Sequence, residues 1–169
     1  MYDVCAPHAR GRAHEKPALY RESCSVGCVS VSGPAQTTIR RLGPGDEAVV
    51  RKLAEGKPQT ALLADEETIF LAAFQGTEPV GFVFGYELAR RHGDPSILFV
   101  YELEVEAAFR RQGIASALMV ELGQIARSRG IREGFVLTEP DNAAANELYR
   151  SLGGAATETV MWGLKYTGD

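Results

Sequence analysis

The chain has 169 residues, of which 45% are hydrophobic and 24% charged, and its net charge is −4 at pH 7. This length and composition indicate one soluble globular domain with a sizeable core, and no apolar run approaches the roughly 20 residues of a membrane span. The negative charge argues against a nucleic-acid partner and favours a cationic one. Because the N-terminus lacks an apolar core of the signal-peptide type, we expect a cytoplasmic protein.

The first 36 residues differ from the rest of the chain. They show no sustained periodicity and are rich in Ser, Gly, Pro and Arg, so we predict a mostly irregular extension over 1–36 and a single folded domain over 37–169. The predicted domain carries 14 basic and 19 acidic residues, a net charge of −5, which suits a cationic ligand.

All three cysteines, Cys5, Cys24 and Cys28, lie in this extension. An odd number argues against a closed disulfide framework. Cys24 and Cys28 could be drawn with His8 and His14 as a zinc site, but the spacing is irregular and no second cysteine pair follows. We therefore expect no bound metal and reduced thiols.

The first half of the predicted domain has three β-type stretches and two helical ones. Residues 37–42 alternate as in a short strand, and residues 43–56 follow as a helix with Asp46 near its start and Gly56 as its stop signal. A second helical piece covers 58–63. Two β-type runs, IFLAAF at 69–74 and PVGFVFGYEL at 79–88, are separated by QGTE, a spacing that predicts a hairpin.

The second half alternates strands and helices. The strand predicted at 97–105 places Glu102 and Glu104 on one face and Tyr101, Leu103 and Val105 on the other. A loop at 106–113 leads into an amphipathic helix that Gly130 ends. The remaining predictions are a short strand at 134–139, a helix at 140–154 with Asp141 or Asn142 as its N-cap, and a final strand at 157–166 with Trp162 in the core. This order predicts an α/β fold with a mixed, mostly antiparallel, twisted sheet flanked by helices.

The stretch EAAFRRQGIASALM, Glu106 to Met119, has the features of a phosphate-binding loop. Exposed N–H groups and the helix dipole favour an anion at the start of a helix that follows a strand and a Gly-containing loop. Gly113 and Ala115 let the backbone approach the ligand, and Arg110 and Arg111 add cationic donors. The stretch lacks the Lys-Ser/Thr of a nucleotide P-loop and the glycine pattern of a dinucleotide fingerprint. An ordinary helix N-terminus is the competing interpretation.

Two motifs resemble the GNAT superfamily of N-acetyltransferases. In that family an R/Q-x-x-G-x-G/A segment follows the fourth strand and binds the pyrophosphate of acetyl-coenzyme A, and this chain has RRQGIA in that place. The family also has N-x-x-A-x-x-x-Y before a glycine, which is matched here by Asn142, Ala145, Tyr149 and Gly153. The resemblance covers about residues 37–166. It implies the GNAT fold, acetyl-coenzyme A as donor and, from the family's habit, a homodimer.

A narrower resemblance is to the type I aminoglycoside 3-N-acetyltransferases, which place YDLAV before HRRQGIATAL. Here the corresponding residues are YELEV and FRRQGIASAL. The chain departs from this pattern at the base position, where Glu102 replaces Asp, and the segment between the first strand and the hairpin is short. Since that segment contributes to the acceptor pocket, the resemblance bears more strongly on the donor than on the acceptor.

The resemblance implies a role for each matched residue. Glu102 is the expected general base, since an ammonium must lose a proton before it can attack, and we expect its carboxylate in a partly buried cleft; Glu102 could instead only bind substrate. Glu104 is the reserve candidate or a solvated residue. Tyr149 donates a proton to the departing thiolate or packs on the pantetheine arm. The expected cofactor-binding residues are Leu103, Val105 (through its backbone N–H), Arg110, Arg111, Gln112, Gly113, Ile114, Ala115, Ser116, Asn142, Ala145 and Tyr149.

The acceptor side is predicted to be acidic. Glu139 and Asp141 follow the strand where the sheet opens, and convergent carboxylates suit a polycationic aminoglycoside; Asp141 could instead cap its helix. Asp65, Glu66 and Glu67 form a solvated turn or line the acceptor mouth. The predicted function is acetyl transfer from acetyl-coenzyme A to an aminoglycoside by direct attack, because the cysteines all lie in the extension. The alternatives are a protein N-terminus or a polyamine as acceptor, a non-catalytic acyl-coenzyme A binding module, and a P-loop hydrolase.

Overall fold

A computed structural model describes residues 29–31, 37–54, 56–92 and 95–166. Six strands form one sheet in the order β1-β2-β3-β4-β5-β6, antiparallel throughout except for the parallel pair β5 and β6. The strands are β1 Val29–Val31, β2 Thr37–Arg41, β3 Thr68–Gln75, β4 Glu78–Leu88, β5 Ile97–Val105 and β6 Gly134–Val136. The α-helices are α1 Glu47–Leu53, α2 Ile114–Ser128 and α3 Ala143–Ser151, with short 3-10 turns at η1 Thr60–Leu63 and η2 Ala107–Phe109. This confirms the predicted α/β fold with a mixed, mostly antiparallel sheet flanked by helices.

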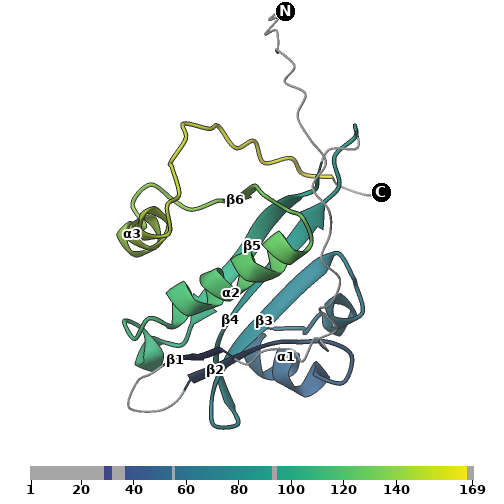
Figure 1. Ribbon diagram of the computed structural model, residues 1–169, viewed down its shortest axis with the longest axis vertical. Helices are drawn as coiled ribbons and strands as arrows, with labels where there is room; N and C mark the ends of the chain where they lie inside the picture. The colour runs from purple at the N-terminus through teal and green to yellow at the C-terminus, as the bar shows by residue number, and fades with distance from the viewer. Residues whose placement is uncertain (1–28, 32–36, 55, 93–94, 167–169) are drawn as a thin grey trace, which may run out of the picture.

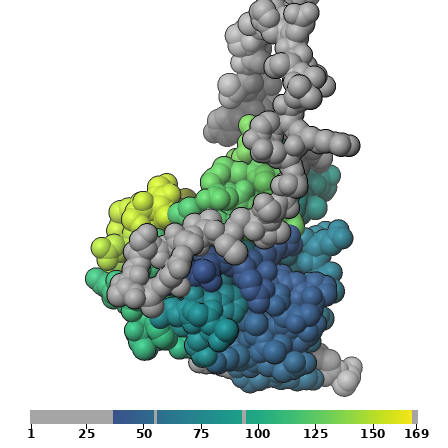
Figure 2. All heavy atoms as spheres, turned by 60° about the horizontal axis from the view of Figure 1, so that its bottom comes forward, coloured from purple at the N-terminus to yellow at the C-terminus, as the bar shows by residue number. Residues whose placement is uncertain are grey.

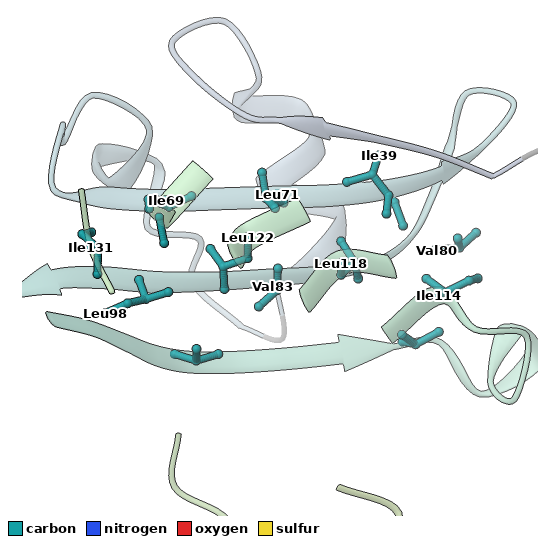
Figure 3. Close-up of a cluster of buried hydrophobic side chains, with 14 residues drawn as sticks. Ile39, Ile69, Leu71, Val80, Val83, Leu98, Ile114, Leu118, Leu122 and Ile131 are labelled. Atoms are coloured by element: carbon teal, nitrogen blue, oxygen red, sulfur yellow. The ribbon is translucent and has the colours of Figure 1, made fainter. Parts of the chain in front are cut away.

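Helix α2 covers one face of the sheet, crossing β3, β4 and β5 (Figure 1). Its sequence places apolar residues four apart, and Ile114, Leu118, Leu122 and Ala126 are the buried ones. They pack on β-strand residues such as Leu71 and Val83 (Figure 3). Burying a leucine of this kind contributes roughly 2–3 kcal/mol, so this layer fixes α2, and hence its N-terminus, on the sheet.

The opposite face of the sheet is packed by α1 and η1. Its core is rich in aromatic residues, and Phe70, Phe82 and Phe84 contact one another with ring centroids 5.3–6.4 Å apart. Tilted and offset arrangements of this kind are the favourable geometries for aromatic pairs. The aromatic surface continues along β4 and β5 beyond the two helices.

Strand β5 contains a bulge that changes one predicted face. Glu102 pairs with Phe84 but Val100 pairs with Gly85, so Tyr101 is the extra residue. Its ring contacts Phe84 at 5.2 Å, on the face of Glu102 rather than the face of Leu103. The prediction that Tyr101 lies opposite Glu102 is therefore wrong, because simple alternation does not hold across a bulge. Gly85 permits the close approach, since a Cβ there would lie 2.5 Å from the Phe99 carbonyl oxygen.

Val29–Val31 form strand β1 and pair with β2, within the segment 1–36 that the sequence predicts to be mostly irregular. The prediction of a final strand at 157–166 is wrong, since these residues have no regular secondary structure and Trp162 is 81% exposed rather than buried. A strand needs hydrogen bonds to a neighbouring strand, and none of the described strands pairs with this segment. The cysteines and the candidate zinc residues lie outside the described residues.

Candidate active site

The C-terminal end of β5 opens away from β6. The parallel pairing of the two strands ends at Val100 and Val136, so the residues of β5 after the bulge have β4 on one side only. Glu106 donates its N–H to Val80 of β4 (3.0 Å). Because alternate backbone groups of a strand point to opposite edges, the N–H and C=O of Val105 point toward the gap left by β6.

Arg110 fixes the loop that follows. Its Nε donates to the Val105 carbonyl oxygen at 2.7 Å, which satisfies the acceptor that faces the gap and leaves the adjacent N–H of Val105 directed there. A guanidinium can make this bond and still direct its other N–H groups elsewhere. Arg110 therefore positions the loop in addition to supplying positive charge.

The start of α2 has the geometry expected for an anion site. Gly113 is the N-cap with φ 80°, no side chain caps the helix, and the first helical bond runs from Ala117 N–H to the Gly113 carbonyl. The N–H groups of Ile114, Ala115 and Ser116 thus have no acceptor within the helix. Arg111 also has a positive φ of 62°, and successive residues that turn in this way form concave backbone surfaces that bind anions.

A cleft of about 580 Å³ lies between this helix start and α3. It gathers eleven of the residues predicted to bind cofactor or substrate, together with apolar residues suited to a pantetheine arm, such as Phe109 and Leu148. The volume is within the usual range for small-molecule sites, roughly 300–1,000 Å³. The predicted residues in the lining are Leu103, Glu104, Val105, Arg110, Arg111, Gly113, Ile114, Ala115, Ser116, Asn142 and Ala145.

Helix α3 forms the second wall of the cleft. Asn142 is its N-cap, and its Oδ1 accepts from the Ala145 N–H at 3.1 Å, so Asn142 rather than Asp141 caps the helix. Four further α3 residues, not predicted from the sequence, also line the cleft: Ala144, Glu147, Leu148 and Ser151. Their signal was present, since Leu148 and Ser151 continue the helical spacing from Ala144 and Ala145.

Five predicted site residues lie outside the lining of the cleft: Glu102, Gln112, Glu139, Asp141 and Tyr149. Tyr149 is half-buried one turn after Ala145, and its burial raises the pKa of the phenol above its usual value. Its hydroxyl therefore stays protonated at neutral pH, as a proton donor must. Gln112 is exposed and its side-chain amide donates weakly to the Ala108 carbonyl (3.4 Å). Glu139 and Asp141 are exposed.

Glu102 is exposed, whereas we expected it in a partly buried cleft. The bulge places it beside Tyr101 at the end of a row of ring contacts that runs across β4, β5 and β6. We call this the aromatic row; its members are Phe84, Tyr86, Phe99, Tyr101 and Phe135, with neighbouring centroids 4.8–5.8 Å apart. The row is not predictable from the sequence pattern, since it arises only when the strands pair.

Carboxylates gather at one end of the aromatic row. Burial raises the pKa of the Tyr86 phenol, and the neighbouring Tyr101, Asp65 and Glu102 raise it further. Asp65 is held by Thr68 Oγ1 (2.6 Å) and the Glu67 N–H (3.1 Å), which lower its pKa. Asp65 and Glu102 thus both act electrostatically on Tyr86, and carboxylates close to an aromatic ring attract an ammonium group.

Other classes of site are not evident in the described part of the chain. Those residues contain no group of three or more His, Cys, Asp or Glu side chains placed to hold a metal ion. None of the helices found there has the length and apolarity needed to cross a membrane.

Comparison with known proteins identifies the family and several relatives. Residues 40–153 match the model of the acetyltransferase (GNAT) family. L-2,4-diaminobutyric acid acetyltransferase of Streptomyces coelicolor is 36% identical over 75 residues, which span 44% of this chain and 42% of that protein. The match therefore covers less than half of this curated relative.

Solved structures agree with the fold. An aminoglycoside acetyltransferase from an uncultured soil metagenomic sample is 27% identical, with a TM-score of 0.72 over 78% of this chain and 99% of that one. AAC(6')-Iy in complex with the bisubstrate analogue CoA-S-monomethyl-acetylneamine is 22% identical, with a TM-score of 0.65 over 78% of this chain and 99% of that one. At this identity the second likeness concerns the fold alone.

Proposed function

Because this chain belongs to the acetyltransferase (GNAT) family and is an acetyl-coenzyme A-dependent N-acetyltransferase, we propose that it acetylates an aminoglycoside antibiotic at the 3-amino group. Acetylation turns an ammonium into a neutral amide, so the product binds its anionic RNA target less well and the cell gains resistance. We assign the catalytic domain to residues 37–169, and strand β1, Val29–Val31, adds to the edge of its sheet.

The observation that carries this proposal is the combination of aromatic rings and carboxylates beside β5. A polyamino sugar offers apolar ring faces and several ammonium groups. Tyr101, which is 58% exposed, can stack against such a ring, and Glu102 and Asp65 can hold ammonium groups at either side. The net charge of −5 over residues 37–169 also favours a polycationic ligand.

The donor side is assigned to the cleft. The N–H groups of Ile114, Ala115 and Ser116, with Arg111, would bind the pyrophosphate, and the apolar residues between α2 and α3 would bind the pantetheine arm. Acetyl-coenzyme A supplies a thioester carbonyl as the electrophile. The Val105 N–H, which points into the gap between β5 and β6, is placed to hydrogen-bond an oxyanion there, a contribution that is commonly large in acyl transfer.

Two side chains are assigned to proton movement. Glu102 takes the proton from the substrate ammonium, directly or through one water, so that the neutral amine can attack. Tyr149, whose raised pKa keeps its phenol protonated, gives a proton to the leaving thiolate. Glu104 is half-buried and lines the cleft, and is the second candidate for the base. The competing role for Glu102 is binding of the ammonium without proton transfer.

A second acceptor class is a small diamine or diamino acid. It is favoured by the 36% identity to L-2,4-diaminobutyric acid acetyltransferase, and the acidic face suits it as well. Peptide N-termini and polyamines, which GNAT enzymes also acetylate, are the remaining alternatives.

An acceptor panel separates these proposals. Coenzyme A release would be followed with gentamicin, kanamycin, L-2,4-diaminobutyrate, spermidine and peptides with free N-termini, and products would be assigned by NMR. We expect the highest kcat/KM with an aminoglycoside and acetylation at its 3-amino group. Modification at the 6′-amino group would refute the 3-N assignment, and a preference for the diamino acid or peptides would refute the aminoglycoside assignment.

Tyr101→Ala, with Tyr101→Phe as the matched control, tests the face itself. Loss of the ring should raise KM for the aminoglycoside about tenfold and leave KM for acetyl-coenzyme A unchanged. Phe should behave nearly as wild type, because it keeps the stacking surface.

A further inference from the structure

Residues 65–68, which we call the Asp65 turn, connect η1 to the start of β3. The Asp65 carboxylate accepts from Thr68 Oγ1 at 2.6 Å and from the Glu67 N–H at 3.1 Å. Burial raises the pKa of the Tyr86 phenol, and the charge of Asp65 adds to this effect, so Asp65 acts on the aromatic row. The place of this carboxylate on the acceptor face therefore depends on what holds the turn.

The Asp65 turn lies at the end of the sheet, between its two layers. Thr68 pairs with Tyr86, and the side chains of such a pair point to the same face, here the face of α1 and η1. Glu87, the next residue of β4, points to the face of α2. In Figure 2 the blue residues, which include α1 and η1, form the lower right of the molecule and the green atoms of α2 lie above them. A side chain on the α2 face can thus reach the backbone of the turn from behind.

Arg129 makes this contact. Its Nη1 donates to the Glu66 carbonyl oxygen at 2.8 Å and to Glu87 Oε2 at 3.1 Å. The side chains of this ion pair are only 25% and 24% exposed, so solvent and salt screen it less than a surface pair. The Glu87 N–H in turn donates to the Glu67 carbonyl oxygen at 2.8 Å. Helix α2 and strand β4 therefore hold two successive carbonyls of the turn.

The backbone of Arg129 is itself firmly fixed. Arg129 is the C-cap of α2, and Gly130 follows it with φ 80°. The Gly130 N–H donates to the Arg127 carbonyl (3.0 Å) and the Ile131 N–H to the Ala126 carbonyl (3.0 Å), which is the bond pattern of a Schellman motif. Ile131 is buried in the core. The guanidinium of Arg129 thus extends from a rigid point.

Hydrogen bonds, rather than packed side chains, hold the turn on this side. A second cavity of about 610 Å³ lies here, and its lining is polar apart from Ala89: Arg41, Glu66, Glu67, Glu87, Ser96 and Arg129. Arg41 Nη2 also donates to the turn, at the Thr68 carbonyl oxygen (3.2 Å). Burial and the nearby Arg129 lower the pKa of Arg41, so the turn brings two cations together. Because the space is not filled by apolar groups, the turn can shift when a bond is lost.

We propose that Arg129 is a positioning residue for the acceptor: by holding the Glu66 carbonyl, it fixes Asp65 where an ammonium group of the substrate binds. This inference rests on the proposed function, which makes Asp65 part of the acceptor face. The donor site is remote from Arg129, because the 15 residues of α2, about 22 Å of helix, separate it from the helix start at Gly113. Arg129 should therefore affect the acceptor and not acetyl-coenzyme A.

Steady-state kinetics with gentamicin test this separation. Arg129→Ala should raise KM for gentamicin about tenfold and leave KM for acetyl-coenzyme A and kcat within about twofold of wild type, since the loss concerns ground-state binding. Arg129→Lys should recover part of the loss. Arg90→Ala is the matched control: it breaks the ion pair with Glu133 (2.5 Å) at the same end of the sheet and should behave as wild type. An equal rise of both KM values in Arg129→Ala would overturn the proposal.

Asp65→Ala shows whether Arg129 acts through Asp65. If it does, the variant that combines Asp65→Ala with Arg129→Ala should have the same KM for gentamicin as Asp65→Ala alone, whereas additive effects would overturn the proposal. A raised KM in Asp65→Ala with none in Arg129→Ala would overturn the positioning role only. An unchanged KM in Asp65→Ala would refute the acceptor face and this inference with it.

A measurement without acceptor completes the test. The bonds from Thr68 and Glu67 hold the pKa of Asp65 below its usual value, and a loosened turn would weaken them. Carbon-13 NMR titration of the Asp65 carboxyl should show this pKa moving up in Arg129→Ala and unchanged in Arg90→Ala. An Asp65 titration that is the same in Arg129→Ala and wild type would mean that Arg129 does not position the carboxylate.

Discussion

Gly113→Ala tests the phosphate cradle with a very small change. Gly113 has φ 80°, a conformation that costs an L-residue about 1–2 kcal/mol, and no atom lies within 4 Å of the position that its new Cβ would occupy. The substitution therefore adds backbone strain without a clash. The chain can relieve the strain only by rotating the loop away from its left-handed conformation, and this rotation would move the N–H groups of Ile114 and Ala115.

The magnitude follows from the hydrogen bonds at stake. A hydrogen bond to a charged group contributes about 1.5–3 kcal/mol, so losing one or weakening two raises Kd for acetyl-coenzyme A about tenfold to a hundredfold. If the loop keeps its conformation instead, the strain appears as reduced stability of about 1–2 kcal/mol. We expect both effects, shared between affinity and stability.

Gly76→Ala is the matched control. Gly76 also has a positive φ, 60°, and open space around its Cβ position, but it lies in the turn between β3 and β4. Calorimetric titration with acetyl-coenzyme A and urea unfolding would be run on both variants. The control should lose stability and keep its affinity. If Gly113→Ala binds acetyl-coenzyme A as tightly as Gly76→Ala does, the assignment of the cradle is wrong.

Three further predictions follow. Tyr149→Phe should lower kcat about a hundredfold with little change in KM for acetyl-coenzyme A, whereas a kcat near that of wild type would mean that Tyr149 only packs. Arg110→Ala removes the bond to the Val105 carbonyl and should raise KM for acetyl-coenzyme A about tenfold, less than a bulky residue at Gly113, and Arg110→Lys should recover only part of the loss. Asp46→Asn should lower the free energy of unfolding by about 1 kcal/mol at neutral pH, since the hydrogen bond and ion pair with Arg40 hold the pKa of Asp46 below its usual value. The stability that this ion pair contributes is present above the pKa that Asp46 has in the unfolded chain, and it is lost as the pH falls through the lower pKa of the folded state. Urea unfolding near pH 3 should therefore show a smaller difference between the variant and wild type than at neutral pH.

The parts of the fold that the sequence predicts well depend on short-range patterns. The hairpin of β3 and β4, strand β5 and helix α2 were predicted nearly residue by residue, because their hydrophobic periods are long and Gly113 and Gly130 mark the limits of α2. The helix start at Gly113, to which we assign the pyrophosphate, is predicted for the same reason, since its position depends on a local loop and glycine pattern.

The errors lie where a residue's environment depends on distant strands. The bulge at Tyr101 is set by pairing with β4, where Gly85 allows the approach. The aromatic row, too, exists only once β4, β5 and β6 are adjacent. The sequence of 157–166 has the alternation of a strand, but a strand forms only when another strand pairs with it. Alternation alone could not show that the pairing is absent within one chain.

Coenzyme A release with gentamicin by wild type and Glu102→Gln tests the assignment of the base most directly. We expect turnover by wild type and a loss of at least a hundredfold in kcat for the variant, with acetyl-coenzyme A binding unchanged. Turnover by Glu102→Gln within a few-fold of wild type, with only KM for gentamicin raised, would contradict the assignment of Glu102 as the base and leave it as a binding residue.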